Sequence, residues 1–495
     1  MFGLRIEAKM KSGLLGLLLF LGSISYAVAA TWYVDNAMAN DTGNGTSWAT
    51  AKKLIYSGIQ LMAGGDTLYV ATGTYTGDNN RIRGIPSGSA GNTTKVYAAV
   101  DFGVILSGLN SGTSPSLEQA PVNVYTSSYI DIEGFLLKDC IGDSQYALSG
   151  VSVSDSDHIR IRKFGIKNGA WSGANYAGAV EVSGSSYCLL EDVFACGMMR
   201  YGLFYIGGST NHHNIMRRCV VRWDYCTTDQ PRASIVVYGG GIGTTVSANN
   251  ILQNCIVIDG NQGSGATFTG GYSVPHETSY TTRYGCISLN NNGYGMHSSE
   301  DTLSNNNDNT MCVIWDSDSG MWWNRLASAG GGAFMSTVEG ANIDGSTDFN
   351  VTVASCAVVV GSITNATQIN NSTTAVVGDF TYILRSPYAN RGATIEKQMG
   401  TTGTYWGDTG YATLSATDLW PFPYEDNIRT LFRETNDPPA GLDPATNNVT
   451  RGFCAANQTL SDYIWEYLGN DSPYPSASGG GGGTSTISGN LRIGG

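Results

Sequence analysis

The stretch "ILQNCIV", residues 251–257, places a cysteine inside a segment with the apolar alternation of a β-strand. The same position recurs in "YIDIEGF" (129–135), "HIRIRKF" (158–164), "YCLLEDV" (187–193) and "HNIMRRC" (213–219). Its occupants are Phe135, Phe164, Val193, Cys219, Cys255, Cys286, Cys312 and Cys356, at intervals of 29, 29, 26, 36, 31, 26 and 44 residues. A unit of 26 to 36 residues, with short strands and no helix, predicts one turn of a solenoid in which each position stacks on itself.

Two further positions repeat with the first. An apolar residue usually follows two positions later, as at Leu137, Ile166, Val221 and Val257, which is the strand period with one face buried. Four residues after the aligned position stand turn formers, namely Asp139, Asn168, Gly197, Asp259, Asn290 and Asp316. Such residues tolerate the left-handed backbone of tight corners, so they predict corners between flat sheets.

The cysteines of this column are predicted to be buried, reduced thiols. Stacked strands lie about 4.8 Å apart, whereas the Cβ atoms of a disulfide lie about 3.8 Å apart. The chain also has no CxxC pair and no local Cys/His cluster, which argues against a structural zinc site. A small buried hydrophobe is the role that remains for Cys219, Cys255, Cys286, Cys312 and Cys356.

The N-terminal segment 32–77 adds a resemblance. Tyr33-Val34-Asp35, Thr46-Ser47-Trp48, Gly65-Asp66 and Gly73-Thr74-Tyr75 are similar to the opening of secreted right-handed parallel β-helix proteins of the pectate-lyase-like superfamily. The expected fold is therefore all-β, a right-handed parallel β-helix of about 8–11 coils. We expect an N-terminal capping helix within residues 47–62 and short C-terminal helices around 427–435 and 459–469, the last one opening at Thr459.

The sequence divides into four predicted regions. Residues 1–30 have the layout of a signal peptide, with an uncleaved membrane anchor as the alternative. The β-helix is predicted over residues 31–410, a C-terminal extension with short helices over 411–475, and a Gly-rich linker and tail over 476–495. We expect a secreted or cell-surface protein without stable membrane insertion after signal cleavage. A net charge of −13 disfavours nucleic acid as a partner.

The resemblance implies a polysaccharide partner and two chemistries. Lyases of the superfamily use an Arg or Lys as base, often with Ca²⁺ held by Asp, and its hydrolases use paired acids. This chain has neither an Asp-Asp pair nor a Gly-His-Gly. Weak catalytic candidates are Glu181, Arg200 and His297, and weak Ca²⁺ candidates are Asp316 and Asp318.

A second strand in each coil supplies candidates for binding. Its aligned outward residues are Ser152, Glu181, Phe204, His297 and Trp322, and beside them lie Arg200, Tyr201, Tyr294, Trp323 and Arg325. Aromatic side chains next to polar groups suit a saccharide site. The alternative is that loops cover this face and these side chains pack beneath them.

Two functions stay open. The first is a secreted β-helix protein that binds polysaccharide, with lyase or hydrolase cleavage undecided. The second is a non-catalytic surface, adhesion or extracellular-matrix β-helix. The polysaccharide and the oligomeric state do not follow from the sequence.

Overall fold

The computed structural model describes most of the chain between residues 29 and 468. The stretches outside this description are 109–119, 141–148, 169–177, 198–200, 208–210, 224–232, 240–246, 261–269, 275–277, 299–305, 324–330, 335–336, 340–342, 345–351, 355, 360, 370, 376–396, 400–413, 434–451 and 457. The predicted tail 476–495, the expected C-cap Gly469 of the helix around 459–469, and nearly all of the predicted signal peptide therefore lie outside the described residues.

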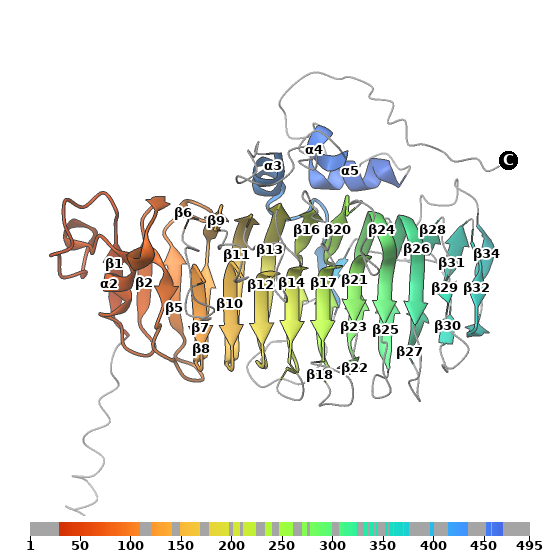
Figure 1. The fold of residues 1–495 in the computed structure, drawn as a ribbon, viewed down its shortest axis with the longest axis horizontal. Helices are drawn as coiled ribbons and strands as arrows, with labels where there is room; N and C mark the ends of the chain where they lie inside the picture. Colours follow the sequence, from red (N-terminus) through yellow and green to blue (C-terminus); the bar gives the residue numbers. More distant parts are fainter. Residues whose placement is uncertain are drawn as a thin grey trace, which may run out of the picture.

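The chain winds into an elongated parallel β-helix, with coils stacked from β1 at one end to β34 at the other (Figure 1). All strand pairs of the main 32-stranded array are parallel and join strands of successive coils. The strands form three stacks, which we call sheets 1, 2 and 3. The predicted all-β, parallel β-helical fold is confirmed.

Sheet 1 contains β4 (Ile82–Arg83), β7 (Val122–Tyr125), β10 (Val151–Ser154), β12 (Gly178–Ser183), β14 (Tyr201–Ile206), β17 (Ala233–Tyr238), β21 (Gly270–Val274), the second halves of β24 (Ile287–Ser298) and β26 (Val313–Trp323), β29 (Ile343–Asp344) and β32 (Ile363–Thr364). Sheet 2 contains β1 (Thr31–Val34), β2 (Thr67–Val70), β5 (Thr94–Ala98), β8 (Ser128–Glu133), the first halves of β11 (Asp157–Lys167) and β13 (Leu189–Gly197), β15 (Ile215–Arg217), β19 (Ile251–Gln253), β23 (Thr282–Tyr284), β25 (Asn307–Thr310), β27 (Gly331–Phe334), β30 (Thr352–Ala354) and β33 (Thr367–Ile369). Sheet 3 contains β3 (Gly73–Tyr75), β6 (Val104–Ser107), β9 (Phe135–Lys138), the second halves of β11 and β13, β16 (Val220–Trp223), β20 (Ile256–Ile258), the first halves of β24 and β26, β28 (Thr337–Glu339), β31 (Ala357–Val359) and β34 (Ser372–Ala375).

The register of sheet 3 follows the alignment predicted from the sequence, with one correction. Leu137 pairs with Ile166 and Val221 pairs with Val257, as expected for one interior column. However, Ile314 pairs with Val338, and Val338 pairs with Val358. The 44-residue interval between Cys312 and Cys356 therefore holds two coils, so these consecutive members of the aligned series lie two coils apart, and no cysteine marks the coil between them.

The corners of the coils lie where the turn formers predicted them. Asp139, Asn168, Gly197, Asp259, Asn290 and Asp316 all have a left-handed backbone, with φ between 50° and 86°. A second corner precedes the aligned position and includes Gly134, Lys163, Asp192, Arg218 and Asn254, also at positive φ. The backbone therefore turns at the same places in successive coils, which keeps the strands in register.

The interior is a single apolar column along the axis. Cys219, Cys255, Cys286, Cys312 and Cys356 are fully buried within it, and the cysteines among the described residues form no disulfide. Each thiol of the first four donates to a backbone carbonyl of the preceding coil; for example, Cys255 Sγ lies 3.5 Å from the Met216 oxygen. Burial raises the pKa of the Cys255 thiol well above its usual value, which keeps this donor protonated.

Replacing Cys255 with serine is expected to lower the free energy of unfolding by about 1–3 kcal/mol, because a more polar hydroxyl would occupy an apolar column. Urea denaturation of parent and variant measures the loss. Alkylation of the denatured, unreduced protein with mass mapping should also find Cys255, Cys286 and Cys312 as thiols. If these residues were recovered as disulfides, the stacking of the column would be wrong.

The N-terminal cap is a short helix, α2 (Ile55–Ile59), preceded by the 3-10 turn η1 (Trp48–Thr50). Ile55 and Ile59 are buried against the first coil. Gly58 allows this close approach, since a Cβ atom there would lie 2.4 Å from a methyl group of Val34. The helix is shorter than the segment 47–62 in which it was expected, and a second 3-10 turn, η2 (Asp78–Asn80), follows β3.

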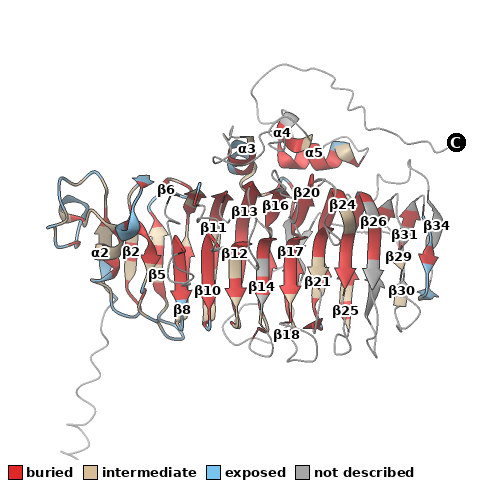
Figure 2. Cartoon of the chain, in the orientation of Figure 1, coloured by how far each residue is buried: buried red, intermediate tan, exposed pale blue. Residues whose placement is uncertain are grey.

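Three helices lie across the outer face of sheet 3, above the middle of the solenoid (Figure 1). They are α3 (Glu425–Arg433), α4 (Gly452–Ala455) and α5 (Leu460–Tyr467). Ile428, Leu431 and Phe432 form the buried face of α3, as their spacing predicted, and Thr459 accepts a hydrogen bond from the Asp462 backbone at the start of α5. The sheet beneath is buried on both sides in this stretch (Figure 2).

The outer residues of sheet 3 explain why it is covered. Phe194, Val220, Ile256, Ile287 and Val313 occupy one outward column, and all are buried with the helices in a second apolar cluster. Strands that are apolar at successive positions are typical of sheets packed on both faces. The sequence-based analysis considered only the inner face and missed this interface.

Two small sheets complete the described structure. β18 (Ser247–Ala248) pairs with β22 (Thr278–Ser279) in parallel, and β35 (Lys397–Met399) pairs with β36 (Leu414–Asp418) in the antiparallel sense. Within the described residues, no helix combines the length and the apolar character needed to cross a bilayer.

Candidate functional site

The outward residues of sheet 1 form one column along the whole solenoid. In coil order they are Arg83, Asn123, Ser152, Glu181, Phe204, Val236, Ser273, His297, Trp322, Asp344 and Thr364. We call this set the sheet 1 column. Parallel pairing without a shift at these residues places each residue beside its neighbours in the adjoining coils, about 4.8 Å apart.

The structure therefore brings the predicted residues of this column onto one strand position. Glu181 lies between Ser152 and Phe204, and His297 lies beside Trp322. Two coils that the sequence-based alignment did not include, those of Val236 and Ser273, separate Phe204 from His297. Tyr201 and Tyr294 share a neighbouring position, with Ala233 and Gly270 between them.

Several predicted site residues cannot be placed by their side chains. Phe204, Trp322, Trp323 and Asp318 belong to strands, but their side chains lie outside the described part of the structure. Arg200 and Arg325 lie outside the described residues altogether. Their proposed roles in binding or catalysis stay predictions.

The middle of the column is not open to solvent. Ser152, Val236 and His297 are each no more than 3% exposed. Val236 packs with Tyr201, Ala233 and the partly buried Tyr238. This is the arrangement expected if neighbouring side chains and segments cover part of the face, so a fully open groove of outward side chains is not what the described residues show.

His297 is held from both sides of its strand. Its Nδ1 atom lies 3.2 Å from Ser273 Oγ of the preceding coil, and its ring stacks on Tyr294 at 5.6 Å. From the interior, Arg283 crosses from sheet 2 and donates to the His297 backbone oxygen at 2.8 Å and to the Ser298 hydroxyl. Arg283 is completely buried, and burial lowers its pKa to about 10. The interior thus fixes the position of the backbone that carries His297.

Among the described residues of the sheet 1 column, Glu181 has a carboxyl group whose pKa is strongly shifted. Burial raises its pKa to about 7, and the Ser149 hydroxyl, which donates to Oε2 at 2.8 Å, opposes this shift. The Ser149 oxygen also accepts from the Gly178 backbone, so it links two coils. A carboxyl group with a pKa near 7 is present in both protonation states at neutral pH, which suits proton transfer.

Glu181 should make stability depend on pH. Because its folded-state pKa lies above the ordinary value of 4.5, folding is favoured while the group is protonated, and stability falls as the pH rises from about 4.5 to about 7. Glu181→Gln removes this dependence, so the variant should gain about 2 kcal/mol relative to the parent between pH 5 and pH 8. Urea denaturation at pH 5 and pH 8 measures the free energy of unfolding of both proteins. If the difference between variant and parent were the same at the two pH values, Glu181 would have an ordinary pKa in the folded protein.

Asp316 is the predicted calcium ligand whose side chain the structure describes. It is an exposed corner residue, and the Tyr467 hydroxyl donates to its Oδ2 at 2.7 Å. No group of three His, Cys, Asp or Glu side chains suited to a metal ion is found among the residues that the structure describes. Calcium binding by Asp316 and Asp318 stays a prediction.

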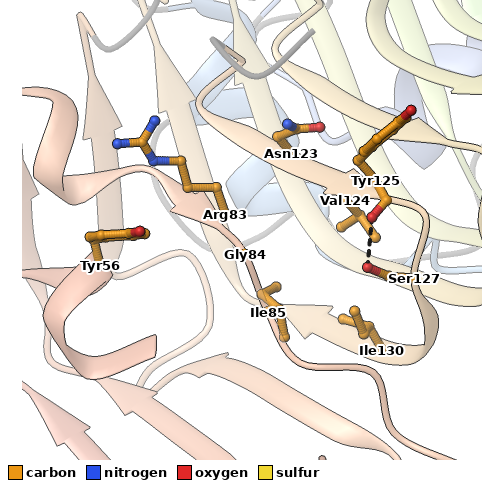
Figure 3. Close-up of a pocket in the computed structure, with 9 residues that line it drawn as sticks. All are labelled: Tyr56, Arg83, Gly84, Ile85, Asn123, Val124, Tyr125, Ser127 and Ile130. Carbon is orange, nitrogen blue, oxygen red and sulfur yellow. Dashed lines mark hydrogen bonds between the residues drawn. The ribbon is translucent and has the colours of Figure 1, made fainter. Parts of the chain in front are cut away.

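A pocket of about 350 Å³ opens at the N-terminal end of the sheet 1 column (Figure 3). Arg83 and Asn123, paired neighbours in the column, line it together with Tyr56 of α2 and the exposed Tyr125. Ile85, Val124 and Ile130 supply its apolar wall. The sequence-based analysis missed this site because β4 is only two residues long and Arg83 lies in no recognisable repeat.

Comparison with known proteins gives a fold-level likeness. No protein-family model matches the sequence, and no curated protein matches it. Similar solved structures include pectate lyase Pel9A (12% identity, TM-score 0.41, covering 78% of this chain and 96% of that chain) and a rhamnogalacturonan lyase (12%, 0.38, 90% and 100%). Another is PfbA, a surface adhesin of Streptococcus pneumoniae (10%, 0.34, 63% and 86%). Such low similarity concerns the fold alone, and the parallel coil register of this chain itself confirms the predicted parallel β-helix.

Proposed function

We propose that this protein is exported and binds polysaccharide along sheet 1. The observation that carries the proposal is the sheet 1 column, a row of mostly polar, ionisable and aromatic residues, interrupted by Val236, that ends in a pocket. The outer faces of the other two sheets are less available to a ligand. The outer face of sheet 3 is covered by helices in its middle, and the charged residues Asp131, Arg162, Glu191 and Arg217 of sheet 2 are engaged in ion pairs with one another.

The shape of the column suits a linear ligand. Its residues repeat about every 4.8 Å, so Phe204 and Trp322, four coils apart, are separated by roughly 19 Å along the axis. A chain of sugar rings lying along the axis would meet Tyr201 at one coil and Tyr294 three coils later. Ser273 of the intervening coil, which precedes that of Tyr294, carries a hydroxyl group suited to hydrogen bonds with sugar hydroxyls.

Cleavage is a second candidate function, and Glu181 is the observation that favours it. Its pKa near 7 is that of a proton-transfer group at neutral pH. A polysaccharide lyase or hydrolase needs at least one partner for this carboxyl group, and Arg200, three residues before the next coil's Leu203, is the nearest candidate in sequence. Without such a partner, the same face would serve a surface or matrix protein that binds glycans without cleaving them.

Removing one aromatic ring of sheet 1 should weaken glycan binding by about 1–2 kcal/mol, the scale of a lost aromatic contact. Tyr294→Ala and Trp322→Ala are the test variants, and Tyr69→Ala is the control, because Tyr69 is a half-buried tyrosine in the aromatic row of sheet 2. Immobilised neutral and acidic polysaccharides serve as probes, with melting temperatures measured in parallel. The proposal fails if no polysaccharide binds the parent, or if Tyr69→Ala weakens binding as much as the sheet 1 variants do.

The same preparation decides about cleavage. Incubation with each bound polysaccharide, followed by assays for reducing ends and for the ultraviolet absorbance of unsaturated products, separates hydrolase from lyase chemistry. Glu181→Gln should abolish whichever activity is found. Binding without either product would assign the protein to the non-catalytic class.

A further inference from the structure

The pocket at the start of the sheet 1 column contains a cation, Arg83, to which the described residues supply no anionic partner. Arg83 forms no ion pair within the described residues, and its Nε atom is buried without a hydrogen-bond acceptor. Its guanidinium group lies over the Tyr56 ring, 5.0 Å from the ring centroid, which orients it without neutralising it. The neighbouring Arg81, by contrast, is paired with Asp78 at 3.1 Å.

Asn123 adds a second unsatisfied group on the adjacent strand. This residue is 6% exposed, and its Oδ1 atom has no hydrogen-bond partner in the part of the chain that the structure describes. Buried polar atoms are satisfied in the great majority of native structures, so an unsatisfied pair lining one pocket indicates a ligand or solvent. Because Arg83 and Asn123 are directly paired in register, both side chains reach the same space (Figure 3).

The residues that line the pocket determine which chemical groups a ligand must carry. Arg83 only donates, and its planar group matches the oxygens of a carboxylate or a sulfate. Asn123 Oδ1 only accepts, so it requires a donor such as a hydroxyl group. Tyr125, 54% exposed, offers surface for the carbon side of a ring. A volume of about 350 Å³ lies at the small end of ligand pockets.

We propose that this pocket binds one sugar residue that carries an oxyanion, with Arg83 donating to the carboxylate or sulfate and Asn123 accepting from a ring hydroxyl. This inference rests on the proposed function and extends it, since it makes the N-terminal end of the sheet 1 column a charge-selective subsite. The rest of the column would bind sugar rings irrespective of charge.

Monosaccharides that differ only at C6 isolate this subsite. Glucuronate, glucose 6-sulfate and glucose, and the corresponding galactose series, are titrated calorimetrically into the full-length protein. At least one anion should bind about tenfold or more tightly than its neutral counterpart, as expected for charge-assisted hydrogen bonds. The carboxylate and sulfate arms show which oxyanion the pocket accepts.

Variants assign the preference to Arg83. Arg83→Gln should reduce binding of the anion to the level of the neutral sugar, whereas Arg83→Lys should keep part of the difference. Arg429→Gln removes an equal charge from the exposed side of α3 and should change nothing. Tyr125→Ala should weaken the binding of all of the sugars to the same extent. Melting temperatures confirm that each variant is folded.

The outcomes separate this inference from the proposed function. Equal affinities for anionic and neutral sugars in the parent, or a preference that survives Arg83→Gln, would overturn the inference even if polysaccharides bind sheet 1. Conversely, an anion that binds through Arg83 while no polysaccharide binds the parent would leave the pocket assignment standing and overturn the proposed function.

Discussion

Replacing Asp259 with asparagine is expected to lower the free energy of unfolding by about 3–5 kcal/mol, the cost of breaking a buried ion pair. Asp259 and Arg222 are both completely buried, with Arg222 Nε 3.2 Å from Oδ2. The Phe453 backbone and the Tyr463 hydroxyl, both from the C-terminal extension, also donate to this carboxylate, at 2.9 and 3.1 Å. The substitution leaves the Arg222 charge buried and removes an acceptor that anchors α4 and α5. Urea denaturation followed by circular dichroism measures the loss.

Asp316→Asn is the matched control. Asp316 occupies the same corner position, with φ of 50° against 54° for Asp259, but it is exposed and accepts a hydrogen bond from α5 through the Tyr467 hydroxyl. Its substitution should cost less than about 1 kcal/mol. Similar losses for the two variants would mean that the extension is not anchored through Asp259.

Truncating Phe164 to alanine should cost about 3–5 kcal/mol, the range for large aromatic residues in protein cores. Phe164 is fully buried in the interior column, and its ring lies 5.7 Å from that of Phe135 in the preceding coil. Thermal and urea unfolding measure the effect, with Val100→Ala as a control at a side chain that is 59% exposed. A loss below 1 kcal/mol at Phe164 would contradict a tightly packed interior.

The sequence predicts the interior of this fold well because a solenoid repeats its own contacts. Phe164, Cys219 and Cys255 differ in size, yet each has an apolar residue two positions later and a corner residue near it. Strand alternation and stacking therefore leave the same signal in every coil. The coil of Val338 was not recognised in the sequence because Ser336, not a cysteine, stands two positions before Val338.

The sequence does not predict what covers the outside. The apolar residues Val220, Ile256, Ile287 and Val313 do signal a second buried face, but nothing in them identifies the covering segment. That segment, α3 to α5, lies more than 100 residues further along the chain, and its helices were predicted without a docking partner. Long-range packing of this kind depends on surface shape and on single contacts such as that of Asp259 with Tyr463.

The candidate site was also predicted only in part from the sequence. Register alone placed Glu181, Phe204, His297 and Trp322 in one column, since identical strand positions must stack. Burial did not follow from register: His297 is 3% exposed although it points outward. The pocket at Arg83 depends on where α2 places the Tyr56 ring, which no local pattern reveals.

A crystal structure of the full-length protein with a bound oligosaccharide tests the central claim most directly. The account predicts sugar rings along sheet 1, parallel to the solenoid axis, with one ring in the pocket of Arg83 and Asn123 and others beside Tyr294 and His297. Sugar bound to sheet 2 or to the C-terminal helices, with sheet 1 unoccupied, would contradict it.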